Sequence, residues 1–66
     1  MKVREVLRLL RREGWVLVRQ RGSHRQFLHP DKPGAVTVAG HPGDDLARGT
    51  LRSILRQAAI EPDDIS

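Results

Sequence analysis

Three features are missing from this sequence, and each absence excludes a class of protein. The 66 residues include no cysteine, so the chain has no disulfide, thiol nucleophile or cysteine-based zinc site. That composition fits a reducing compartment, and we expect a cytoplasmic protein. No apolar run approaches the ~18 residues of a membrane span, and the N-terminus lacks the apolar segment of a secretory signal. We therefore expect no membrane association and a single domain over residues 1–66.

Acidic residues are also scarce in the first half of the chain, where Glu5 and Glu13 are the only ones in residues 1–29. The formal net charge is +4, and the remaining acids gather mainly toward the C-terminus. A basic half on a small protein favours a polyanionic partner, with RNA or DNA as the first candidates.

Two segments carry the apolar spacing of an amphipathic helix. In residues 2–13 the apolar side chains recur at i, i+3, i+4 and i+7, and Gly14 follows as a left-handed C-terminal cap. The second helix is predicted from Thr50, as N-cap, to about Ala59, after a possible helical turn at Asp44 or Asp45. A short final turn is expected over residues 61–65. The two predicted stripes are Val3, Val6, Leu7 and Leu10, then Leu51, Ile54, Leu55 and Ala58.

Between the helices the sequence predicts three strands. Residues 15–20 and 23–29 are separated by a turn at Arg21-Gly22, and residues 35–39 follow a loop rich in proline and glycine. The order is α-β-β-β-α, an α+β fold with a three-stranded antiparallel sheet. Each helix has one apolar stripe to bury, so both helices must cover one face of the sheet. This is the arrangement of the double-stranded-RNA-binding domain (dsRBD), and we expect Trp15 and Phe27 in its core.

The stretch from Arg19 to Phe27 concentrates the chemistry-bearing residues. It contains three arginines, Ser23 and His24 around a single glycine, with no acid among them. Guanidinium groups match phosphate oxygens, and histidine is the side chain suited to proton transfer near neutral pH. The plainer interpretation is a solvated basic hairpin that happens to contain a histidine. Regular alternation also places Arg25 on the same face as Phe27, so a charged side chain would point toward the core. A bulge near Gly22 or a position at the strand's edge would resolve this conflict.

Three segments together resemble the HicA family of toxin–antitoxin systems. They are Gly14-Trp15, Arg19-Gln20-Arg21-Gly22-Ser23-His24 and Gly49-Thr50-Leu51-Arg52-Ser53-Ile54-Leu55-Arg56-Gln57-Ala58. The resemblance implies a small messenger-RNA interferase with a dsRBD-like fold, a catalytic His24, and a HicB antitoxin that masks the site. The family commonly has Val-Pro-x-His before its second histidine, whereas this chain has Val38-Ala39-Gly40-His41. The loss of that proline predicts a softer loop around His41.

A metal site is not expected from these residues. His24 and His29 are five residues apart and so point to opposite faces of a regular strand, and no carboxylate lies between Gly14 and Pro30. RNA carries its own nucleophile, the 2′-hydroxyl, so cleavage needs no metal or other cofactor. We predict transesterification to a 2′,3′-cyclic phosphate with His24 as general acid or base. His41 or water is the second proton-transfer partner.

The phosphate in this mechanism needs positively charged partners. Arg21 and Arg25, together with Arg19, are expected to hold it and stabilise its developing charge. Ser23 is expected to bond a phosphate oxygen or orient His24. Two competing functions remain: a non-catalytic dsRBD-like RNA-binding module, and an interaction domain for an acyl group or protein partner. The basic N-terminal half disfavours the last of these.

Overall fold

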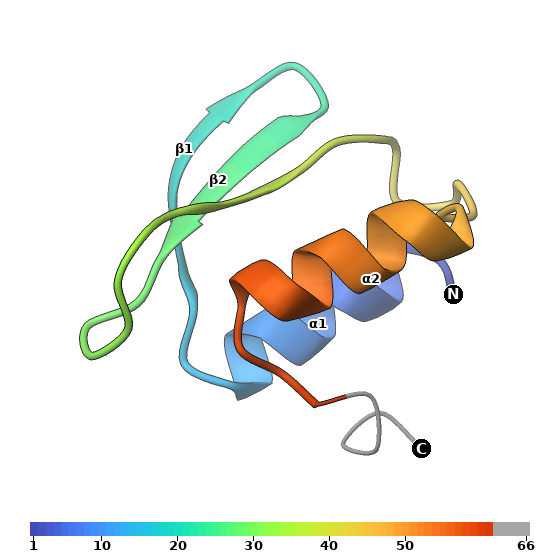
Figure 1. Ribbon diagram of the computed structural model, residues 1–66. Coiled ribbons are helices and arrows are strands. Elements are labelled where there is room, and N and C mark those ends of the chain that lie inside the picture. Colours follow the sequence, from blue (N-terminus) through green and yellow to red (C-terminus); the bar gives the residue numbers. More distant parts are fainter. Residues whose placement is uncertain (62–66) are drawn as a thin grey trace.

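The computed structural model describes residues 1–61, which contain two helices and three strands. Their order is α1 (Val3–Arg12), β1 (Val16–Arg21), β2 (His24–Leu28), β3 (Val36–Val38) and α2 (Arg48–Gln57). The strands form one antiparallel sheet in the order β1-β2-β3, and both helices lie on the same side of it (Figure 1). The predicted α-β-β-β-α fold is therefore confirmed. The final turn expected over residues 61–65 lies, from residue 62 onward, outside the described residues.

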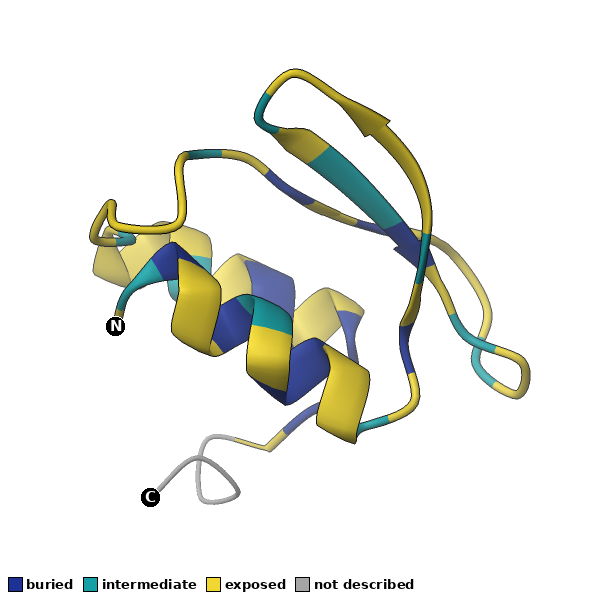
Figure 2. Ribbon diagram, turned by 180° about the vertical axis from the view of Figure 1, so that it is seen from behind, coloured by how far each residue is buried: buried dark blue, intermediate teal, exposed yellow. Residues whose placement is uncertain are grey.

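The core is built from the facing sides of the helices and the sheet, as the dark bands in Figure 2 show. Phe27, Val36 and Val38 supply the sheet's contribution, and Trp15 is buried just before β1, so both expected aromatic core residues are confirmed. The helical stripes differ slightly from the prediction, because Leu7 and Leu51 are only partly buried while Leu9 is buried. The buried helical residues are Val3, Val6, Leu9 and Leu10 in α1 and Ile54 and Leu55 in α2, and the C-cap residue Ala58 is buried as well.

The two helix boundaries were predicted with different success. Gly14 follows α1 with a φ of 93°, in the left-handed region, as predicted for a C-terminal cap. The start of α2 was predicted wrongly: the helix begins at Arg48 after Ala47, and Thr50 lies inside its first turn. A side-chain cap contributes only about 1 kcal/mol. Here the backbone N–H of Leu46 donates to the carbonyl of Met1 at 3.0 Å, which fixes the chain just before α2.

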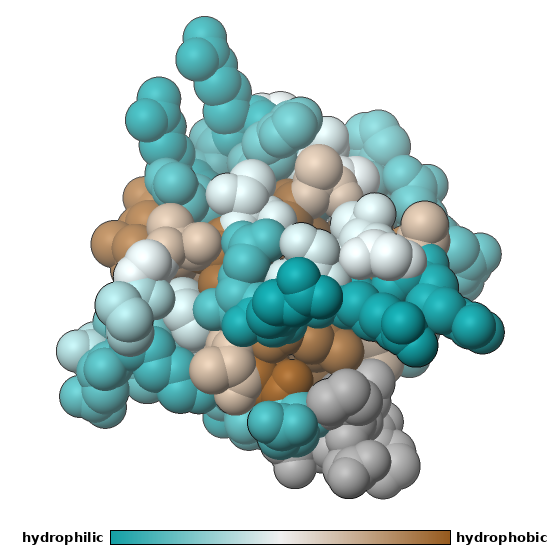
Figure 3. All heavy atoms as spheres, viewed as in Figure 1, coloured by the Kyte–Doolittle hydropathy of each residue, from teal (hydrophilic) through white to brown (hydrophobic). Residues whose placement is uncertain are grey.

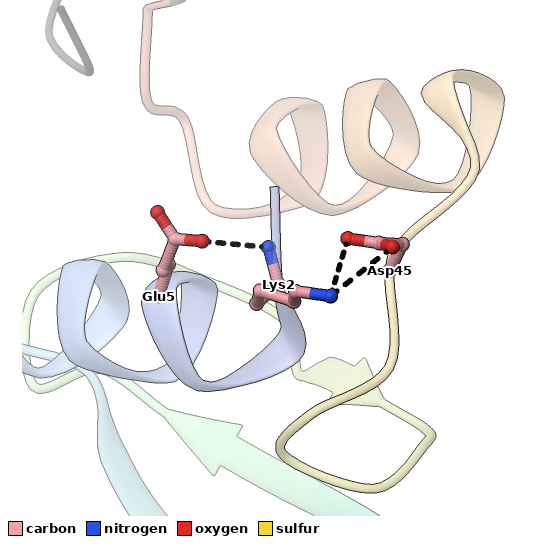
Figure 4. Close-up of polar contacts among 3 residues, drawn as sticks. All are labelled: Lys2, Glu5 and Asp45. Carbon is pink, nitrogen blue, oxygen red and sulfur yellow. Dashed lines mark hydrogen bonds and ion pairs between the residues drawn. The ribbon is translucent and has the colours of Figure 1, made fainter.

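The loop before α2 is not the helical turn predicted at Asp44 or Asp45. It crosses the N-terminus of α1 instead, and the N–H groups of Val3 and Arg4 donate to the carbonyls of Asp44 and Pro42. Asp45 forms a β-bridge with Lys2 and a 3.2 Å ion pair with its ammonium, drawn in Figure 4. The first N–H groups of a helix lack intrahelical partners. Backbone carbonyls of this loop accept hydrogen bonds from two of these N–H groups. The N-terminus of α1 and the loop before α2 therefore hold each other in place.

The β1–β2 hairpin turns at Gly22-Ser23, one residue later than predicted, and Ser23 therefore lies in the turn rather than in a strand. Gly22 has a φ of 58°, as the first central residue of a two-residue type II′ turn requires. The register shifts between Leu17 and Arg19, so Val18 is an extra residue in β1. The bulge thus lies within β1, four residues before the predicted position near Gly22.

Candidate active site

The bulge at Val18 determines which side chains share a face. Phe27 is buried and pairs with Leu17, so both face the helices. Strict alternation from Leu17 would also turn Arg19 and Arg21 toward the core. With Val18 inserted, Arg19 pairs instead with Gln26, and Arg21 with His24. The two arginines and His24 therefore lie together on the outer face of the sheet, away from the helices.

These side chains line a shallow hollow of about 380 Å³. Arg19, Arg21, His24 and Gln26 form most of its wall, and Thr37 joins them across the sheet as the partner of Gln26. Within residues 1–61, the guanidinium groups of Arg19 and Arg21 make no hydrogen bond or ion pair, and neither does the imidazole of His24. The hollow therefore combines two uncommitted guanidinium groups with one uncommitted imidazole, which is the chemistry that a phosphodiester requires.

Arg25 differs from the other two arginines. It pairs with buried Val38, which places it on the core side of β2, and its guanidinium donates to the carbonyls of Gly40 (2.9 Å) and Ser23 (3.3 Å). The conflict with Phe27 is thus resolved by a position at the core's edge, where these carbonyls satisfy the charge's hydrogen-bonding needs. Arg25 reaches the hollow as well as holding two loops together.

One family model was found to match this chain: the HicA toxin of bacterial toxin–antitoxin systems, over residues 3–60. The chain is a member of the HicA toxin family. The match spans both helices and all three strands, so it covers the hollow as well as the core. Members of this family are the toxins of toxin–antitoxin pairs. The chain therefore has the role of a toxin, and this role implies an antitoxin partner. No individually curated protein matches the chain.

The HicA match leaves the individual site residues to be located from the structure. Ser23 is half-buried in the hairpin turn and does not line the hollow; its carbonyl accepts the bond from Arg25. His41 is exposed outside the hollow, in the loop that crosses α1. That loop is tied down without the family's proline, because the His41 N–H donates to the Asp44 carboxylate at 3.0 Å. The structure therefore gathers Arg19, Arg21, His24 and Arg25, and leaves Ser23 and His41 outside the hollow.

His29 has a structural environment rather than a place in the hollow. Its Nδ1 accepts the N–H groups of Asp31 (3.0 Å) and Lys32 (3.2 Å), and its Nε2 lies 3.1 Å from the carbonyl of Glu13. Because Nδ1 is an acceptor, Nε2 carries the proton and donates. The ring also packs edge-on against Trp15, with 5.1 Å between the ring centroids. His29 thus joins the end of α1 to the loop after β2.

Two side chains of the hollow were missed in the sequence, Gln26 and Thr37. Each occupies an outward position, and the strand register pairs Gln26 with Thr37. The amide of Gln26 makes no hydrogen bond within residues 1–61, whereas that of Gln20 donates to the Gly22 carbonyl at 3.1 Å. Gln26 and Thr37 can be recognised as neighbours of His24 only once the strand register is known.

Neither helix in residues 1–61 is long and apolar enough to cross a membrane. Across the same residues, no three His, Cys, Asp or Glu side chains form a group that could hold a metal ion.

Proposed function

We propose that this HicA-family toxin is an endoribonuclease that cleaves messenger RNA in the cytoplasm by metal-independent transesterification. The observation that carries the proposal is the gathering of Arg19, Arg21 and His24 in one open hollow by the bulge at Val18. β-Bulges are over-represented beside active sites because they re-aim side chains. A shallow hollow on an open sheet face admits an extended strand.

The proposed reaction uses the substrate's own 2′-hydroxyl as nucleophile. Its oxygen attacks the adjacent phosphorus, the bond to the 5′-oxygen of the next nucleotide breaks, and the products are a 2′,3′-cyclic phosphate and a 5′-hydroxyl. His24 accepts the 2′-hydroxyl proton or donates one to the leaving oxygen, and water or His41 serves as the other partner. Arg19 and Arg21 stabilise the charge that develops on the phosphate oxygens, and Arg25 assists from the rim of the hollow.

We further propose that a HicB-like antitoxin inhibits the toxin by covering this hollow with acidic side chains. The hollow's uncommitted arginines favour an anionic partner, and occupation of the hollow excludes RNA. The competing function, RNA binding without cleavage, draws support from the lack of any residue that orients His24 within residues 1–61.

Induction in growing bacteria separates the two functions. We expect the wild-type chain to arrest growth, and His24→Ala, accumulated to the same level, to permit it. The matched control is Gln20→Ala, which removes an exposed polar side chain of the same hairpin that does not line the hollow. Messenger-RNA fragments ending in a cyclic phosphate identify cleavage. Arrest by His24→Ala without such fragments would mean that the chain acts by binding RNA without cleaving it.

A further inference from the structure

The hollow accounts for only part of this chain's positive charge. A second concentration lies on α2, most of which falls in the segment Gly49–Ala58 that resembles the HicA family, and α2 contributes nothing to the hollow. Arg48, Arg52 and Arg56 recur there every four residues, and all three are exposed. Figure 3 shows the corresponding band of strongly hydrophilic side chains across α2, with paler side chains along one border and apolar ones along the other. We call these three residues the arginine row.

The spacing of the row suits a linear polyanion. An α-helix rises 1.5 Å per residue, so successive members of the row are offset by about 6 Å along the axis. Buried Ile54 and Leu55 hold α2 on the core, which fixes the row on a rigid element. A guanidinium binds two oxygens of one phosphate, so three regularly spaced arginines can engage successive phosphates of a strand.

The row does not serve the stability of α2. The helix contains no acidic residue, and none of the three guanidinium groups has a hydrogen bond or ion pair within residues 1–61. Like charges at i and i+4 repel each other, and a cation at Arg48 opposes the positive end of the helix dipole, whereas only Arg56, in the last turn, interacts favourably with the dipole. Asp45, three residues before Arg48, is paired with Lys2. Glu61 shares a hollow of about 440 Å³ with Arg52 and Arg56 at the end of α2. A charge pattern that costs helix stability points to a ligand.

We infer that the arginine row is a second RNA-binding surface, which holds the sugar–phosphate backbone of the substrate away from the cleavage hollow. The inference rests on the proposed function only in taking RNA as the polyanion. The hollow is on the outer face of the sheet and the row is on the helical side, in a molecule of 30 × 29 × 18 Å. One strand therefore reaches both surfaces only if it is several nucleotides long. Phosphate contacts carry no base information, so the row adds affinity for long RNA without adding sequence preference.

Binding is tested in the His24→Ala background, so that RNA is not consumed, by fluorescence anisotropy over a range of salt concentrations. The probes are a trinucleotide and an unstructured oligonucleotide several times longer. For the long probe, Arg52→Gln/Arg56→Gln is expected to lower affinity roughly ten-fold or more at low salt. The salt slope should fall by about 0.7 for each arginine removed. Trinucleotide binding should be unchanged.

The matched control is Arg4→Gln/Arg8→Gln, which removes the same charge at the same spacing from the exposed face of α1. Arg52→Lys/Arg56→Lys should recover most of the salt slope, and circular dichroism should show the same helix content for every variant. An equal loss of affinity for the long probe in the α1 variant would mean that only net charge matters, and this would overturn the inference. Unchanged RNA affinity with weakened antitoxin binding would make the row a protein-docking surface instead. Because cleavage is not measured, failure of the ribonuclease proposal leaves this result interpretable.

Discussion

A histidine stands at each end of β2, and the two have opposite surroundings. His24 opens the strand on the outer face, where its ring has no hydrogen bond within residues 1–61. His29 follows the strand with both ring nitrogens engaged and its ring packed edge-on against Trp15. The difference teaches that residue type and strand position do not distinguish a reactive histidine from a structural one. The hydrogen bonds already made by the ring do.

The largest expected effect separates catalysis from folding at His24. In purified protein, His24→Ala should lower the rate of RNA cleavage by about 100-fold or more, the usual contribution of general acid–base catalysis. Its free energy of unfolding should stay within about 0.5 kcal/mol of wild type, because the side chain is exposed. EDTA should leave the wild-type rate unchanged. A folded His24→Ala protein that still cleaved RNA would falsify the assignment and transfer the role to His41.

Antitoxin binding should change the chemical reactivity of His24 but not that of His29. A histidine-modifying reagent should react readily with exposed His24 in the free toxin and slowly with His29, whose ring is occupied. In the toxin–antitoxin complex, we expect protection of His24 and no further change at His29, measured by peptide mass spectrometry. Equal reactivity of His24 with and without antitoxin would mean that inhibition does not occur by covering the hollow.

Loss of His29 should act on stability instead. His29→Ala leaves the N–H groups of Asp31 and Lys32 and the carbonyl of Glu13 without their present partner, and it removes the contact with Trp15. We expect a loss of about 1–3 kcal/mol in the free energy of unfolding, measured by urea denaturation. Cleavage per folded molecule should be preserved. A stable His29→Ala protein with impaired cleavage would contradict this division of roles.

The arginines allow a finer comparison. Arg21→Ala should reduce the salt slope of RNA binding by about one charge and leave stability unchanged. Arg25→Ala should reduce the slope similarly, but it also loses the bonds to Gly40 and Ser23, so its melting temperature should fall. Thermal melts and binding isotherms on the same samples measure both effects. Identical melting temperatures for the two variants would show that the carbonyl contacts of Arg25 contribute nothing.

The smallest effect concerns base preference. Gln26 offers a free amide in the hollow, so Gln26→Leu should change the relative cleavage of RNAs that differ in one base by a few-fold up to about ten-fold. The control is Gln20→Leu, whose amide is already bound to Gly22. Sequencing of cleavage ends gives the preferences, and equal profiles for wild type and Gln26→Leu would exclude base reading by this residue.

Apolar periodicity and turn residues were sufficient to predict the order of elements, because each helix and strand buries one face. The cationic stretch with His24 was equally visible from residue types. The shared face of Arg19, Arg21 and His24 was not, because it depends on a bulge at Val18 that no glycine or proline marks. Tertiary hydrogen bonds also overrode local preference at Thr50 and Asp45. Such effects depend on strand register and distant partners, which a short sequence window does not contain.

The bulge has one more consequence, for solubility. Within residues 1–61, β1 is an edge strand, and Val16 and Val18 are each more than half exposed on it. An open edge with exposed apolar side chains invites pairing with another copy of the chain. A bulge disrupts the regular ladder at that edge, and the charges of Arg19 and Arg21 repel a second copy. The arginines proposed to hold RNA are therefore also expected to oppose aggregation, and a variant that abolishes toxicity at His24 instead of at the arginines should retain that protection.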